Sequence, residues 1–154
     1  MNSLKKILLV EDKAKDAELT LAALETHNLA NEVTVVRDGV EALDYLYGRG
    51  KFAGRAPGLP AVVLLDIKMP RLSGLEVLRA IKADPQLKRL PVIMLTSSRE
   101  EPDLVRAYEL GVNAYVVKPV DFHQFTDAVE QIGAFWAILN ELPPDRTPLP
   151  EPSL

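Results

Sequence analysis

The sequence predicts an α/β protein, with a single doubly wound sheet of five parallel strands and helices on both faces. Five short apolar runs recur along the 154 residues, and a helical pattern follows each of them. The runs are continuous rather than alternating, which is typical of strands covered on both faces. They are residues 7–10, 33–36, 61–65, 92–95 and 114–117.

Helical patterns follow these runs, and local capping signals support three of them. The predicted helices are residues 14–26, 40–47, 74–83, 100–110 and 122–139. Asp38 precedes the second helix, Ser97 and Ser98 precede the fourth, and Asp121 precedes the fifth, all of them residue types that cap helix N-termini. Periodicity does not determine the strand order, but 2-1-3-4-5 is the common solution for right-handed crossovers at this size.

Two segments depart from this repeat. Residues 48–60 contain four glycines, two prolines and three basic side chains. They join a helix to the next strand, so we expect a solvated surface loop at the amino ends of the strands, away from the usual ligand-binding edge. Residues 143–154 contain five prolines, which predict an extended or disordered tail. The predicted domain therefore spans residues 1–142.

The composition excludes several classes of protein. A hydrophobic fraction of 47% with 26% charged residues is typical of a globular chain, and the net charge of −4 offers no cationic field to nucleic acid or anionic lipid. Cysteine is absent, His27 and His123 are too far apart for a local zinc motif, and no apolar run approaches the ~18 residues of a membrane helix. We expect a cytoplasmic protein that binds neither nucleic acid nor membrane.

Chemically active side chains follow the predicted strands. Glu11 and Asp12 follow the first strand, Asp66 the third, Thr96 the fourth and Lys118 the fifth. Ligands bind beyond the carboxyl ends of parallel strands, and neighbouring strands lie only ~4.8 Å apart. We therefore expect three carboxylates to converge at one edge of the sheet.

Converging carboxylates disfavour one another's ionisation unless a cation lies between them. A hard divalent ion with oxygen ligands, most simply Mg²⁺, meets that need. Lys118 would lie on the other side of a phosphoryl group, so that its charge is neutralised from two directions, and Asp66 would be the nucleophile that becomes phosphorylated.

Each of these residues also has a simpler interpretation. Asp12 alone is better explained as a helix cap, and Asp66 alone is equally well a turn residue. Thr96 and Lys118 singly are better explained as part of a capping segment and as a solvated side chain. Their coincidence at one edge of the sheet indicates a site.

The motifs together resemble the receiver domain of two-component response regulators, which has a flavodoxin-like fold. The resemblance covers residues 7–119 in the expected order and is specific as a set, although each motif alone is weak. The matching segments are Ile7-Leu8-Leu9-Val10-Glu11-Asp12, Asp38-Gly39-x-Glu41-Ala42-Leu43, Leu64-Leu65-Asp66-Ile67-Lys68-Met69-Pro70 with Gly74, Leu95-Thr96-Ser97, Gly111-Val112-Asn113-Ala114-Tyr115 and Val117-Lys118-Pro119.

The resemblance implies a phosphorylation switch rather than a conventional enzyme. A sensor histidine kinase would donate its phosphoryl group to Asp66 in a reaction that requires Mg²⁺. Glu11, Asp12, Asp66 and the backbone carbonyl of Lys68 would ligate the metal, and Lys118 would pair with the phosphoryl group. Lys68 departs from the asparagine frequent at this position, which bears on the rate of autodephosphorylation.

The resemblance also implies how the switch is read. Thr96 would move toward the phosphoryl group and leave space into which Tyr115 rotates, a shift between two packings. The surface that reports the change would be the fourth helix, the fifth strand and the fifth helix.

The predicted last helix has more apolar residues near its end than one buried stripe requires. This surplus, which includes Phe135, Trp136 and Leu139, favours a homodimer through the same region, although some of it can also fold back over the sheet. With the long 48–60 loop and no output domain, the chain is similar to the stand-alone regulators of phytochrome-type kinases.

Three other classes of protein share features with this pattern. An aspartyl phosphatase typically has a second aspartate two residues after the first, where this chain has Lys68. A flavodoxin-type electron carrier would need a phosphate-binding loop where this chain has Glu11 and Asp12, which repel phosphate. A receiver-like binding module that is never phosphorylated is the principal alternative.

Overall fold

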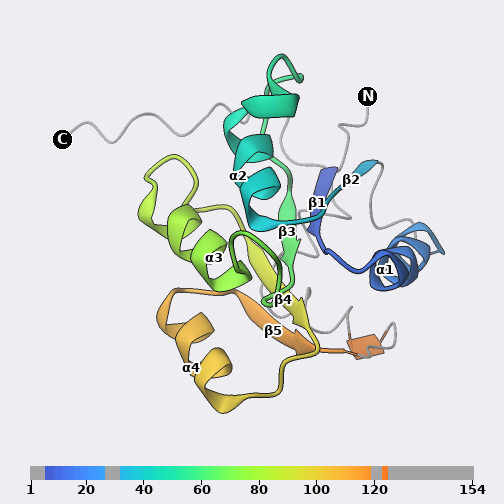
Figure 1. Ribbon diagram of the computed structural model, residues 1–154, viewed down its shortest axis with the longest axis vertical. Helices are drawn as coiled ribbons and strands as arrows, with labels where there is room; N and C mark the ends of the chain where they lie inside the picture. Colours follow the sequence, from blue (N-terminus) through green and yellow to red (C-terminus); the bar gives the residue numbers. More distant parts are fainter. Residues whose placement is uncertain (1–5, 27–31, 119–122, 125–154) are drawn as a thin grey trace.

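A computed structural model describes residues 6–26, 32–118 and 123–124 (Figure 1). The elements are β1 (Lys6–Val10), α1 (Ala14–Thr26), β2 (Glu32–Val36), α2 (Gly39–Tyr47), the 3-10 helix η1 (Gly50–Phe52), β3 (Val62–Leu65), α3 (Gly74–Ala83), β4 (Val92–Thr96), α4 (Glu101–Glu109) and β5 (Ala114–Val117). All five predicted strands and the first four predicted helices are present, with ends shifted by a residue at most.

The five strands form one parallel sheet in the order β2-β1-β3-β4-β5, as predicted. Val10 at the end of β1 is paired with Val36 of β2 on one side and with Leu65 of β3 on the other. The central strands therefore end level with one another, and the residues that follow them meet at the same edge.

Both faces of the sheet are covered within the described residues. Helix α1 packs on one face through Ala17 and Leu24, whereas α2, α3 and α4 pack on the opposite face (Figure 1). The side chains of β3 and β4 are all buried. Continuous apolar runs predicted these strands because both of their faces lie against helices.

The helix caps confirm one sequence signal and correct another. Asp38 caps α2, since its side chain accepts a hydrogen bond from the amide of Glu41. The serines predicted to cap the fourth helix do not occupy that position: the cap residue of α4 is Glu100, without a side-chain cap hydrogen bond. Ser98 is buried instead, and its contacts belong to the site described below.

Residues 48–60 lie at the amino ends of the strands and are largely exposed, as expected, but they are more ordered than a plain solvated loop. They contain η1, and Phe52 packs edge-on against Tyr45 with ring centroids 5.1 Å apart. Gly48 ends α2 with a φ of 64°, a left-handed conformation that glycine adopts without steric cost. The aromatic contact explains why the loop has a defined path.

The predicted fifth helix (122–139), its dimer residues Phe135, Trp136 and Leu139, and the tail (143–154) lie outside the described residues, apart from residues 123–124. Among the described residues, no helix combines the length and the apolar character needed to cross a bilayer.

Candidate functional site

Five side chains predicted from strand ends come together at the carboxyl edge of the sheet. Glu11 and Asp12 follow β1, Asp66 follows β3, Thr96 ends β4 and Lys118 follows β5. The backbone continues the sheet beyond the strands, since the amide of Asp66 donates to the carbonyl of Val10 at 3.1 Å, and the amide of Lys118 donates to the carbonyl of Thr96 at 2.8 Å. These bonds fix where each side chain starts.

The three carboxylates form a cluster that fits a divalent metal ion. One oxygen from each of Glu11, Asp12 and Asp66 lies within 4.8 Å of the others. Oδ1 of Asp12 is buried and has no hydrogen-bond partner among the described residues. Buried polar atoms are rarely left without a partner, and a hard cation takes oxygen ligands of this kind. The cluster and the unpartnered oxygen together can supply oxygen ligands to a divalent cation.

Lys118 places a positively charged side chain beside these carboxylates. Its Nζ donates a short hydrogen bond to Glu11 and lies 3.1 Å from Oδ2 of Asp16 and 3.6 Å from Oδ2 of Asp66. The side chain is only 12% exposed, and that of Asp66 only 3%. The predicted approach of Lys118 to Asp66 is confirmed. Asp16, in the first turn of α1, was not predicted as a partner of the lysine.

Burial and the contact between opposite charges act in opposite directions on the pKa values of Lys118 and Glu11. Burial acts to lower the pKa of Lys118, but the hydrogen bonds to Glu11 and Asp16 and the charge of Asp66 outweigh it and hold that pKa above its ordinary value. Burial raises the pKa of Glu11, and the nearby Asp66 charge adds to the rise, while Lys118 partly offsets both. The ammonium therefore stays charged at neutral pH.

The backbone around Asp66 is fixed by close packing. Oδ1 of Asp66 accepts a hydrogen bond of 2.7 Å from the amide of Ile67, and the carbonyl of Ile67 accepts one of 2.7 Å from the amide of Gly74. A Cβ atom on Gly74 would lie 2.0 Å from the carbonyl oxygen of Asp66. Only glycine allows the start of α3 to approach this closely. The second carboxylate oxygen, Oδ2, is the one directed toward Lys118.

Thr96 and Tyr115 are joined through Ser98. The amide of Ser98 donates to Oγ1 of Thr96 at 3.2 Å, and the hydroxyl of Tyr115 donates to the carbonyl of Ser98 at 3.0 Å. Burial raises the pKa of Tyr115, which keeps the hydroxyl protonated as a donor. The side chains of both predicted switch residues, Thr96 and Tyr115, are thus hydrogen-bonded to the backbone of Ser98.

Ser98 also connects this segment to α4. Its hydroxyl donates to Oδ2 of Asp103 in the first turn of α4 at 2.6 Å. The sequence signal for this contact is a serine ahead of a helix, a pattern that predicts an ordinary cap. A change at Thr96 therefore has a hydrogen-bonded route to both Tyr115 and α4.

Lys68 lies at the exposed rim of the site. Its ammonium forms an ion pair of 3.3 Å with Glu100, and both side chains are more than three-fifths exposed. Pairs of this kind contribute little to stability, about 0–1 kcal/mol. The side chain of Lys68 therefore points to the start of α4 and leaves its backbone carbonyl free of that contact.

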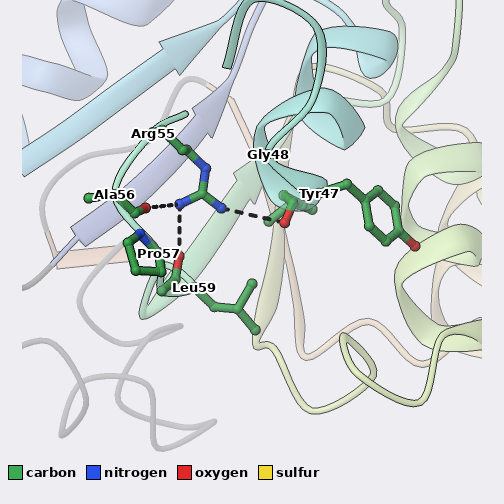
Figure 2. Close-up of a pocket in the computed structure, with 8 residues that line it drawn as sticks. Tyr47, Gly48, Arg55, Ala56, Pro57 and Leu59 are labelled. Atoms are coloured by element: carbon green, nitrogen blue, oxygen red, sulfur yellow. Dashed lines mark hydrogen bonds between the residues drawn. The ribbon is translucent and has the colours of Figure 1, made fainter. Parts of the chain in front are cut away.

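A shallow pocket of about 260 Å³ lies away from this cluster, beside the C-terminal end of α2 (Figure 2). It is lined by Leu46, Tyr47, Gly48, Arg55, Ala56, Pro57, Gly58 and Leu59. The guanidinium of Arg55 donates to the carbonyls of Tyr45, Ala56 and Gly58, so its donors already have backbone partners. The lining has no carboxylate, and the pocket is not part of the acidic site.

Comparison with known proteins agrees with this geometry. Residues 7–130 match the family model of the response regulator receiver domain. The chain is 38% identical over 142 residues to response regulator Rcp1 of a Synechocystis species, covering 92% of this chain and 95% of Rcp1.

Solved structures give the same result. The bacteriophytochrome response regulator RtBRR is 60% identical with a TM-score of 0.80, covering 92% of this chain and 86% of RtBRR. The phosphorylated cyanobacterial phytochrome response regulator RcpA is 42% identical with a TM-score of 0.74, covering 87% and 94%. The Mn²⁺-bound form of Rcp1 is 38% identical with a TM-score of 0.74, covering 90% and 99%.

The fold and the acidic edge define a signalling domain built to accept a phosphoryl group rather than a conventional enzyme. The chain belongs to the response regulator receiver domain family of two-component signalling, as its sequence motifs predicted. Membership implies a histidine kinase as partner and a divalent metal in the site, and the carboxylate cluster provides ligands for such a metal.

Proposed function

We propose that this protein is a stand-alone response regulator in which Asp66 accepts a phosphoryl group from a phytochrome-type sensor histidine kinase in a Mg²⁺-dependent reaction. The observation that carries the proposal is the approach of Lys118 to the buried carboxylate of Asp66, at 3.6 Å, beside a cluster of three carboxylates. Asp66 would accept the phosphoryl group, and Lys118 together with a metal ion at the carboxylate cluster would neutralise the negative charge of that group.

The reaction is a phosphoryl transfer to a carboxylate. Oδ2 of Asp66 attacks the phosphorus of the kinase phosphohistidine, the N–P bond breaks, and the imidazole leaves with the electron pair and takes a proton from water. The hydrogen bond from the amide of Ile67 holds Oδ1, which orients Oδ2 for attack. Lys118 stabilises the charge on the transferring phosphoryl oxygens.

Glu11, Asp12, Asp66 and the backbone carbonyl of Lys68 are the proposed ligands of the ion. When bound, Mg²⁺ supplies positive charge to the phosphoryl oxygens and keeps water positions open. The three-carboxylate cluster and the unpartnered Oδ1 of Asp12 support these ligands.

The proposed output is a change in packing at α4, β5 and the helix predicted over residues 122–139. Thr96 would turn toward the new phosphoryl group, Tyr115 would rotate into the space vacated, and Ser98 would transmit the change to α4. The hydrogen bonds of Ser98 with Thr96, Tyr115 and Asp103 support this route.

We further propose that the protein acts in the cytoplasm as a homodimer formed through this surface, including Phe135, Trp136 and Leu139. The phosphorylated state would end by autodephosphorylation, at a rate influenced by Lys68 at the rim of the site. The phytochrome-type partner is supported by the identities to RtBRR and RcpA, both phytochrome response regulators.

The test is phosphorylation in solution. With Mg²⁺ and acetyl phosphate, intact-mass analysis is expected to show one added phosphoryl group that is labile to base and absent in Asp66→Asn. A phosphorylated phytochrome-type kinase is expected to transfer its label faster than an unrelated histidine kinase. A wild-type protein that stays unmodified by every donor would contradict the proposal and favour the non-phosphorylated binding module.

A further inference from the structure

A strained turn lies in the segment that follows Asp66. Among residues 6–26, 32–118 and 123–124, Arg71 is the non-glycine residue with a positive φ, at 66°. The amide of Leu72 donates to the carbonyl of Pro70 at 2.7 Å, which closes a three-residue γ-turn with Arg71 at its centre. A non-glycine residue in this conformation is unfavourable and persists only where its surroundings enforce it.

The side chain of Arg71 forms the contact that can enforce the turn. Its Nε lies 2.9 Å and its Nη2 2.8 Å from Oδ2 of Asp38. The carboxylate of Asp38 is only 10% exposed, and its other oxygen accepts the amide of Glu41 at 2.8 Å as the cap of α2. One buried carboxylate thus holds both the start of a helix and the strained turn.

Close packing prevents the turn from moving toward α2. A Cβ atom on Gly39, the residue after Asp38, would lie 2.3 Å from the carbonyl of Leu72 and 2.8 Å from Val77. The start of α2 and the turn therefore lie in direct contact, and the Arg71–Asp38 ion pair joins the same two segments.

The turn belongs to the segment that carries the proposed metal ligands. Residues 66–73 connect β3 to α3, beginning with Asp66 and including Lys68, whose carbonyl is a proposed ligand. The segment is fixed near its ends by the hydrogen bond from Gly74 to Ile67. Between these ends, the path of the backbone passes through the γ-turn at Arg71.

We propose that the Arg71–Asp38 ion pair is a positioning device for the metal site: it holds the γ-turn in its strained conformation and thereby fixes the path of the backbone that carries the carbonyl of Lys68, a proposed metal ligand. Arg71 is a positioning residue and touches neither metal nor phosphoryl group. The inference rests on the proposed function, because it concerns the metal site that phosphorylation requires.

The first test measures Mg²⁺ affinity by calorimetry, without phosphodonor. Arg71→Ala is expected to weaken Mg²⁺ binding about tenfold, the lower end for groups that position metal ligands. Arg71→Gly is expected to lose less, because glycine adopts the positive φ without the ion pair. Asp38→Asn keeps an oxygen that can cap α2 but removes the charge that pairs with Arg71. The double variant Arg71→Ala with Asp38→Asn is expected to bind Mg²⁺ no more weakly than Arg71→Ala alone.

Arg49→Ala is the matched control, since Arg49 forms an exposed ion pair of 2.9 Å with Asp44 on the same helix but near its other end. Its Mg²⁺ affinity is expected to equal that of the wild type. A second readout is hydrogen exchange of segment 66–74 in metal-free protein, expected to be faster in Arg71→Ala and unchanged in Arg49→Ala.

The outcomes separate this inference from the proposed function. Folded Arg71→Ala with wild-type Mg²⁺ affinity, or additive losses in the double variant, would overturn the positioning role. A wild-type protein that binds Mg²⁺ but is never phosphorylated would overturn the proposed function alone, since the affinity comparison still decides the role of Arg71. A wild type that binds no Mg²⁺ would overturn both.

Discussion

The two ends of the sheet each hold a cationic side chain among acceptors, and the acceptors differ in kind. At the carboxyl end, Lys118 contacts the ionisable oxygens of Glu11, Asp16 and Asp66. At the amino end, Arg55 donates to backbone carbonyls, among them those of Ala56 and Gly58 (Figure 2). Its guanidinium also lies 4.3 Å from the centre of the Tyr45 ring.

The difference separates the end proposed to react with phosphate from an end whose contacts stabilise the fold. Carbonyls do not titrate or take up a phosphoryl group, so the bonds of Arg55 serve to fix the loop after α2. The carboxylates around Lys118 can exchange partners, and the nearby Oδ1 of Asp12 has none among the described residues. A buried cation that faces titratable groups thus indicates chemistry, and one satisfied by the main chain indicates packing.

Removing the cation at the carboxyl end is expected to give the largest effect. Lys118→Met should lower the rate of phosphorylation by acetyl phosphate about 100-fold, as expected for loss of a preorganised charge at the transferring group. Intact-mass time courses measure the rate. Lys82→Met is the control, because Lys82 is a partly buried lysine whose ammonium donates to the carbonyls of Lys88 and Leu90 instead. Equal rates in Lys118→Met and wild type would remove Lys118 from the reaction.

Removing the cation at the amino end is expected to affect stability and not chemistry. Arg55→Ala should lower the free energy of unfolding by about 2 kcal/mol, since several carbonyls lose a charged donor. Urea unfolding measures the change, and the phosphorylation rate should stay at the wild-type value. Arg49→Ala, whose ion pair with Asp44 is exposed, should cost less than half as much. A slower phosphorylation of Arg55→Ala would mean that the two ends are not independent.

A smaller, pH-dependent effect is expected at Asp38. Burial acts to raise the pKa of its carboxyl, but the amide of Glu41 and the guanidinium of Arg71 outweigh burial and lower it. The charged form then stabilises the fold above the ordinary aspartate pKa of ~3.9, and the stabilisation is lost as pH falls through the lowered value. The difference in unfolding free energy between wild type and Asp38→Asn should therefore shrink below about pH 4. A difference in unfolding free energy that stays constant across that pH range would contradict the lowered pKa of Asp38.

The sequence predicted the residues at the carboxyl end well, because in a parallel sheet the residues that follow each strand all lie at the same edge. Glu11, Asp66 and Lys118 each follow an apolar run. The register brings the ends of β1 and β3 level, and β4 and β5 end two residues further along at the same edge, within reach of the long side chain of Lys118. The strand order and the approach of Lys118 to Asp66 are confirmed for the same reason.

Other contacts have no comparable signal in the sequence. Asp16 meets Lys118 only because α1 starts at a particular angle, and the positive φ of Arg71 has no marker such as glycine. The partners of Arg55 are backbone atoms, whose positions depend on the path of the whole loop. Ser98 carried a signal, but a buried serine and a capping serine look alike in sequence.

The contact between Gly74 and the carbonyl of Asp66 has a consequence for how the site can be damaged. The first residue of α3 packs against the peptide unit of Asp66, the proposed phosphoacceptor, with no space for even one extra carbon. A single methyl group there would act on the reaction by displacement alone, with every charged atom still in place. Loss of activity in this protein therefore need not involve any group that handles phosphate.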